Sequence, residues 1–154
     1  MASATFAKLN LKDQDPIAIV DAPASFEREV TGLDGVKVRR SLGKSPVGWA
    51  LAFATKQAQV DAFAKAVAVA AAGDAVVWIA YPKQSSKRYS CEFNRDTGWA
   101  AMGAAGFEPV RMVAIDEDWS ALRFRRAEYI KTLTRDAKHA LSPAGKAKAG
   151  RKAR

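Results

Sequence analysis

The sequence predicts a three-layer α/β fold, in which helices cover both faces of a mostly parallel sheet of about six strands. Short apolar runs alternate with helical patterns, and several runs are apolar throughout, as strands buried on both faces require. The last two runs lie too close together for a connecting helix, which predicts an antiparallel hairpin at the carboxyl end. Because 154 residues suffice for one large core, we expect a single domain over residues 1–130 and a tail over residues 131–154.

The first half of the domain is predicted to contain three strands and one helix. Pro16 opens the first apolar run, and Ser25 has the residue type of an N-cap, with Glu27 near the positive end of the helix dipole. Residues 1–13 define no element, so we expect an irregular lead-in whose apolar side chains pack on the edge of the domain. In chain order, the predicted elements are strand 17–20, helix 25–30, strand 36–38 and strand 47–53.

The second half begins with the clearest helix, which we predict over residues 56–72. Val60, Phe63 and Val67 recur there at helical spacing and form one apolar stripe, and Gly73 supplies a stop signal. The remaining predicted elements are strand 75–81, helix 94–105 ended by Gly106, strands 111–115 and 120–124, and a short helix over 127–133.

The hairpin connection carries a run of carboxylates that we interpret as structural. Asp116, Glu117 and Asp118 are adjacent on a turn, where carboxylates point apart and stay hydrated, so none has a reason to act as a general acid. We expect the two aspartates to organise the turn, Trp119 to pack its ring, and Arg123 to pair with a nearby acid. The hairpin therefore predicts no catalytic residue.

Composition excludes several kinds of chemistry. The single Cys91 cannot form an internal disulfide and is expected to be partly buried, and the lone His139 completes no metal-binding or nucleophilic group with it. We therefore expect no metal and no cofactor. The chain holds no apolar run of the ~18 residues that a membrane span needs, and its start lacks the pattern of a secretory signal, so we expect a cytoplasmic protein.

The tryptophans are interpreted mainly as core residues. Trp49 and Trp78 lie inside apolar strands, where a large ring is normally buried. Trp99 follows Thr97 and Gly98 and is a candidate for the rim of a pocket.

Three loops follow the carboxyl ends of the predicted strands, where ligands bind in open α/β sheets. They span residues 21–25, 54–57 and 81–88. The third loop combines cationic and hydroxyl side chains that suit a phosphate or carboxylate group. The leading hypothesis is thus a noncatalytic module that binds an acidic small molecule or a protein partner. The candidate ligand-binding residues are Asp21, Thr55, Lys83, Ser85, Ser86 and Lys87.

The formal charge of +9 is concentrated in the tail, because residues 131–154 hold eight Lys and Arg against one Asp. Such a segment attracts nucleic acid through counterion release, without sequence preference, and a solubilising appendage is the alternative. A nucleic-acid accessory protein is therefore a further hypothesis. The tail residues that would contact nucleic acid are Lys146, Lys148, Arg151, Lys152 and Arg154.

Two segments, residues 77–87 and 114–124, together resemble a bacterial family known as the domain of unknown function 3052. The resemblance extends over about residues 14–126 and leaves the basic tail outside it. Since that family has no established activity, the resemblance assigns no role to any residue.

The order of elements is also similar to the class I methyltransferase architecture, a Rossmann-like fold whose parallel sheet ends with an inserted antiparallel strand. That similarity implies a glycine-rich loop after the first strand, where backbone amides cradle the methyl donor. Here the loop is Asp21-Ala22-Pro23-Ala24-Ser25, which has no glycine, and Pro23 also lacks an amide donor. A methyltransferase-like transferase with an altered cofactor loop is therefore the alternative hypothesis.

Overall fold

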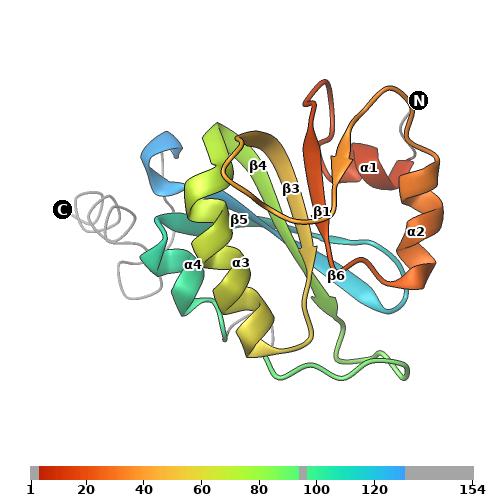
Figure 1. Ribbon diagram of the computed structural model, residues 1–154. Coiled ribbons are helices and arrows are strands. Elements are labelled where there is room, and N and C mark those ends of the chain that lie inside the picture. The colour runs from red at the N-terminus through yellow and green to blue at the C-terminus, as the bar shows by residue number, and fades with distance from the viewer. Residues whose placement is uncertain (1–3, 94–96, 131–154) are drawn as a thin grey trace.

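The computed structural model describes residues 4–93 and 97–130, which form a six-stranded sheet with helices on both faces (Figure 1). The predicted three-layer α/β class is confirmed. In chain order the elements are α1 (Ala4–Lys8), β1 (Ile17–Val20), α2 (Ala24–Thr31), β2 (Val38–Arg39), β3 (Val47–Phe53), α3 (Gln57–Ala70), β4 (Ala71–Pro82), α4 (Ala100–Ala104), β5 (Phe107–Ala114), β6 (Trp119–Arg126) and a 3-10 turn, η1 (Ala127–Tyr129).

The sheet has the strand order β2-β1-β3-β4-β6-β5. The first four strands of this order pair in parallel, while β6 runs antiparallel between β4 and β5. The predicted antiparallel hairpin at the carboxyl end is therefore confirmed, and β6 lies inserted between β4 and β5, as the similarity to the methyltransferase architecture implied. Strands β1 and β3 have the predicted bounds, because their apolar runs begin and end where burial does.

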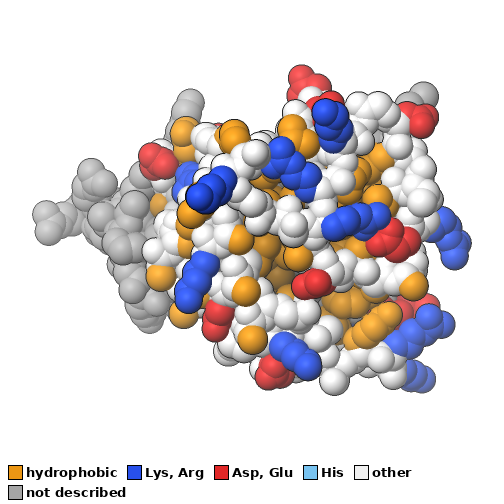
Figure 2. Space-filling view, viewed as in Figure 1, with side chains coloured by type: hydrophobic (Ala, Val, Ile, Leu, Met, Phe, Trp, Pro, Cys, Tyr) orange, Lys and Arg blue, Asp and Glu red, His pale blue; other side chains and the backbone are white. Residues whose placement is uncertain are grey.

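Two apolar cores lie on the two faces of the sheet. α3 and α4 cover one face, with Phe63 and Met102 among its buried residues, and α1 and α2 cover the other. Trp49 and Trp78 are fully buried in the second core, as predicted. On the face that Figure 2 shows, Lys and Arg side chains are interspersed with Asp and Glu, with hydrophobic side chains visible between them.

The prediction of an irregular lead-in is wrong, because residues 4–8 form α1. Phe6 and Leu9 are fully buried in the second core. The carbonyl oxygen of Leu9 accepts hydrogen bonds from the indole Nε1 of Trp49 at 2.8 Å and of Trp78 at 2.7 Å. Since a buried indole N–H needs an acceptor, these two bonds fix α1 against the sheet. A five-residue helix is too short to show a period in the sequence.

The predicted stop of the long helix at Gly73 is also wrong. α3 ends at Ala70, and the chain passes directly into β4 with Ala71 in an extended conformation. Arg126 makes this early end possible, because its Nη2 donates hydrogen bonds to the carbonyl oxygens of Ala68 at 3.2 Å and Ala71 at 2.9 Å. A cation placed there satisfies helix carbonyls and complements the negative end of the dipole.

The carboxyl half differs from the prediction mainly in lengths. α4 covers only Ala100–Ala104, ahead of Gly106 at a φ of 94°, and residues 94–96 of the predicted helix lie outside the described residues. Asp116 Oδ1 accepts the backbone N–H groups of Asp118 at 2.8 Å and Trp119 at 2.9 Å, which confirms the predicted role of Asp116 in the turn. The predicted helix over 127–133 is a 3-10 turn as far as Tyr129, and the basic tail lies outside the described residues.

In the described part of the chain, every helix is too short or too polar to cross a membrane.

Replacing Phe6 with alanine tests whether α1 belongs to the core. The Phe6 ring lies 5.6 Å from that of Phe26 and 5.8 Å from that of Trp49, measured between centroids. Because the ring is fully buried, Phe6→Ala should lower the free energy of unfolding by about 3–5 kcal/mol in urea titrations. The control Val69→Ala, at a side chain that is 71% exposed, should change it by less than about 0.5 kcal/mol. Equal effects for both variants would show that α1 does not pack as described.

Candidate functional site

The carboxyl ends of β1, β3 and β4 bring the three predicted loops to one edge of the sheet (Figure 1). Gln59 links two of them: its Oε1 accepts the backbone N–H of Thr55 at 2.8 Å, and its Nε2 lies 3.5 Å from Asp21 Oδ2. The segment that follows the third loop is joined through Glu92, whose backbone N–H donates to the carbonyl oxygen of Thr55 at 3.0 Å. A continuous polar path therefore runs along this edge.

The loop after β1 turns sharply without glycine. Asp21 itself adopts a φ of 57°, a left-handed conformation that aspartate tolerates better than most residues. Pro23 then occupies the N-cap position of α2 with a φ of −71° and makes no side-chain cap. The turn is thus made by an acidic residue, whose carboxylate is exposed at the carboxyl end of β1.

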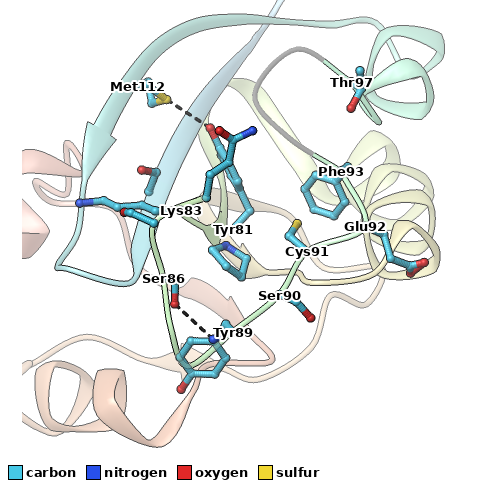
Figure 3. A pocket seen from close by; sticks show the side chains of 14 residues that line it. Tyr81, Lys83, Ser86, Tyr89, Ser90, Cys91, Glu92, Phe93, Thr97 and Met112 are labelled. Carbon is cyan, nitrogen blue, oxygen red and sulfur yellow. Dashed lines mark hydrogen bonds between the residues drawn. The ribbon is translucent and has the colours of Figure 1, made fainter.

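A cavity of about 850 Å³ lies beyond the end of β4 (Figure 3). Tyr81 and Pro82 form part of its wall, the segment after β4 surrounds it, and Met112 of β5 and Ser120 of β6 complete the lining. The Tyr81 hydroxyl donates to the sulfur of Met112 at 3.2 Å, which ties β4 to β5 across the wall. Residues of the parallel strand β4 and of the β5–β6 hairpin therefore both form the cavity wall.

The loop over residues 83–88 is held in place by the hairpin turn. The backbone N–H of Lys83 donates to the carbonyl oxygen of Asp118 at 2.8 Å, and the Ser86 hydroxyl donates to Asp118 Oδ1 at 2.9 Å. Ser86 Oγ also accepts the backbone N–H of Tyr89 at 3.2 Å, as drawn in Figure 3. Asp118 therefore anchors this loop, and the Ser86 hydroxyl is engaged in holding it.

The predicted site residues divide into three groups. Lys83, Ser85 and Ser86 line the cavity, whereas Lys87 is exposed and is not part of the lining. Asp21 and Thr55 lie on the neighbouring stretch of the same edge, linked through Gln59.

Sequence reasoning missed much of the cavity wall. Tyr89, Cys91 and Phe93 come from a segment without periodicity, and Met112 and Ser120 are brought in by the register of the hairpin. The signals that pointed towards this region were the polar loop after the predicted fourth strand and the segment around Thr97.

Trp99 packs against two aromatic residues that line the cavity. It is 4% exposed, and its ring lies 5.5 Å from Tyr81 and 5.0 Å from Phe93 between centroids. The prediction of a rim position is therefore wrong for Trp99, because these aromatic neighbours enclose the indole within the core, whereas Thr97 of the same segment does line the cavity.

Cys91 is half-buried in the cavity wall, as predicted. Burial raises the pKa of its thiol; a hydrogen bond from the backbone of Phe93 opposes this effect, and the Glu92 carboxylate adds to it. Among residues 4–93 and 97–130, no three His, Cys, Asp or Glu side chains group in a way that could hold a metal ion. The wall thus offers a protonated thiol, not an activated one.

Alkylation kinetics test this state of the thiol. Because the thiolate is the nucleophile and a raised pKa lowers its fraction at a given pH, Cys91 should react with iodoacetamide at pH 8 roughly threefold or more slowly than glutathione. Unfolding in urea should restore the ordinary rate. A folded protein that reacts as fast as glutathione would contradict the assigned environment.

Comparisons with known proteins support the fold class. A scan against models of protein families and a search of curated proteins both return no match, so the expected membership of the domain of unknown function 3052 family gains no support. Solved structures do match. A SAM-dependent methyltransferase from Aquifex aeolicus superposes with a TM-score of 0.53 at 14% identity, over 79% of this chain and 87% of that chain.

Two further structures give similar values. The N-methyltransferase NodS from Bradyrhizobium japonicum WM9 has a TM-score of 0.51 at 10% identity, over 78% of this chain and 91% of that one. The pyocyanin biosynthetic protein PhzM has a TM-score of 0.53 at 13% identity, over 80% of this chain and 54% of that one. These similarities show a methyltransferase-like Rossmann fold for this chain.

The loop after β1 does not fit a methyl donor held by a glycine cradle. Ala22 and Ala24 carry side chains where a glycine cradle would have none, and Pro23 offers no amide. The residues present do fit a ligand that brings its own hydrogen-bond donors, because the exposed Asp21 carboxylate accepts hydrogen bonds at this edge.

Proposed function

We propose that the protein is a methyltransferase-like transferase with an altered cofactor loop, which takes an adenosyl methyl donor beyond β1 and β3 and an acceptor in the cavity beyond β4. The observation that carries the proposal is the sheet order, with β6 inserted antiparallel between β4 and β5. Structures named as methyltransferases share this fold. The fold favours a transferase over the noncatalytic module that we expected from the loops alone.

The arrangement of the edge supports this division of roles. In open α/β sheets the ligand crevice lies where the strand order reverses, which here is between β1 and β3. Asp21 and Thr55 stand at that point, and the hydroxyl and ammonium groups of an adenosyl donor would donate hydrogen bonds to the Asp21 carboxylate. Such a donor supplies an electrophilic methyl group when bound. The cavity lies next along the same edge, joined to Thr55 through Glu92.

Calorimetric titration with S-adenosylhomocysteine tests the proposal. We expect a Kd below about 100 μM for the full chain, and Asp21→Ala should weaken it at least about tenfold, since a charge-assisted hydrogen bond contributes about 1.5–3 kcal/mol. The matched control is Asp13→Ala, an exposed aspartate outside this edge, which should leave the Kd unchanged. No binding up to 1 mM ligand, or the same Kd in the Asp21 variant, would overturn the proposal.

A noncatalytic module for an acidic small molecule is the second candidate, and Lys83 is the observation that favours it. Lys83 lines the cavity, and no carboxylate of the described residues lies within ion-pairing distance of its ammonium group. An acidic ligand would supply the missing counter-charge.

A thermal-shift screen of carboxylic acids and nucleotides separates this candidate from the transferase. A module of this kind should show a rise in Tm that grows with ligand concentration. Lys83→Ala should remove the rise, while the exposed control Lys44→Ala should keep it. If no acid raises the Tm, or both variants respond alike, the second candidate is excluded. The hypothesis of nucleic-acid binding through the tail stays a prediction, because that segment lies outside the described residues.

A further inference from the structure

The face of β5 and β6 that lies opposite the cavity carries three arginines. Arg111 of β5 and Arg123 of β6 are direct partners in the antiparallel register, and Arg125 follows two residues later on the same face of β6. Neighbouring pairs identify this face. Val113 pairs with Ala121 of the second core, whereas Met112 pairs with Leu122 of the first core, on the side of the cavity.

The pairing of Arg111 with Arg123 is unfavourable as it stands. Directly opposed side chains of an antiparallel pair lie about 5 Å apart, and like charges at that separation destabilise a sheet. A shift of the register by one residue would separate the two arginines, but it would also move apolar residues to the wrong face of the sheet. The register is fixed by core packing, so both guanidinium groups stay on this surface.

Acidic groups neutralise only part of this cluster. Arg125 is paired with Asp74, with a distance of 2.6 Å from Nη2 to Oδ2 and 2.8 Å from Nε to Oδ1. The buried Glu108 is the register partner of Arg125. The ion pair with Asp74 therefore lies at the Arg125 end of the cluster.

The expectation that Arg123 pairs with an acid is wrong. Its Nη1 donates to the amide oxygen of Asn10 at 3.4 Å, and its Nε is buried without a hydrogen-bond partner among the described residues. Burial lowers the pKa of Arg123; the charges of Arg125 and Arg111 lower it further, and Asp74 opposes them. A buried donor without an acceptor is unfavourable, so Arg123 is not fully satisfied by its contacts within the described residues.

We propose that Arg111 and Arg123 bind a phosphoryl group on the face of β5 and β6 that lies opposite the cavity. Arginine side chains at directly paired positions can match the several acceptor oxygens of one phosphate, because each guanidinium offers a planar fork of N–H donors. Arg111 is exposed, so the group is accessible from solvent. The site stands apart from the cavity, because the two lie on opposite faces of the same strands.

The phosphoryl group could come from a phosphorylated small molecule or from the backbone of a nucleic acid, and the two sources share this chemistry. Titration of the full chain with inorganic phosphate at constant ionic strength tests the site itself, with Tm and calorimetry as readouts. We expect saturable binding that Arg111→Gln weakens at least tenfold. The control Arg28→Gln, at an exposed arginine on α2, should bind phosphate as the unmodified protein does.

A second readout separates anion binding from a structural role. Without phosphate, Arg111→Gln should leave the Tm unchanged or raise it, because the substitution removes the repulsion; with saturating phosphate, its Tm should fall below that of the unmodified protein. A Tm lowered equally in both conditions would overturn the proposal. So would a phosphate response identical in all variants, or one matched by sodium chloride at the same ionic strength.

A short single-stranded oligonucleotide then distinguishes the sources. If Arg111→Gln weakens oligonucleotide binding by the same factor as phosphate binding, relative to Arg28→Gln, the site takes backbone phosphates. If only phosphate binding responds, the ligand is a phosphorylated small molecule.

Discussion

The burial of β1, β3 and β4 on both faces is the constraint on which this structure depends. Strands covered on both sides by helices must be connected by crossovers, and crossovers make neighbouring strands parallel. Parallel strands end at one edge, so the loops after Val20, Phe53 and Pro82 are brought together without any direct attraction between them. The hydrogen bonds of Gln59 and of the Glu92 amide then join segments that the sheet has already brought near.

The hairpin extends this constraint to the cavity and to the arginine pair. Inserting β6 beside β4 places Asp118 where it holds the loop over residues 83–88, and places Met112 and Ser120 in the cavity wall. The same strands present Arg111 and Arg123 on their other face. Because side chains alternate along a strand, the same β5–β6 register places cavity residues on one face and the arginine pair on the other.

The sequence predicts the parts of this fold whose signal is local. Strands β1 and β3 coincide with apolar runs, and the turn role of Asp116 follows from its residue type and position. The parts that it does not predict depend on distant partners. α1 is stable because Leu9 accepts two indole bonds from β3 and β4, and α3 ends where Arg126 of β6 reaches its carbonyls. The candidate site shows the same division, since the polar loops are visible in the sequence and the hairpin's contribution to the wall is not.

The native Cys91 allows a direct test of whether the carboxyl ends of β1, β3 and β4 lie at one edge of the sheet. It is the single cysteine of the chain, so a nitroxide attached there reports on its surroundings without further substitutions. Paramagnetic broadening in NMR spectra should be strong at the amides of Ala22 and Thr55, beyond β1 and β3. It should be weak at Val47 and Ala71, where β3 and β4 begin. Broadening at Val47 and Ala71 with sharp signals from Ala22 and Thr55 would contradict the account.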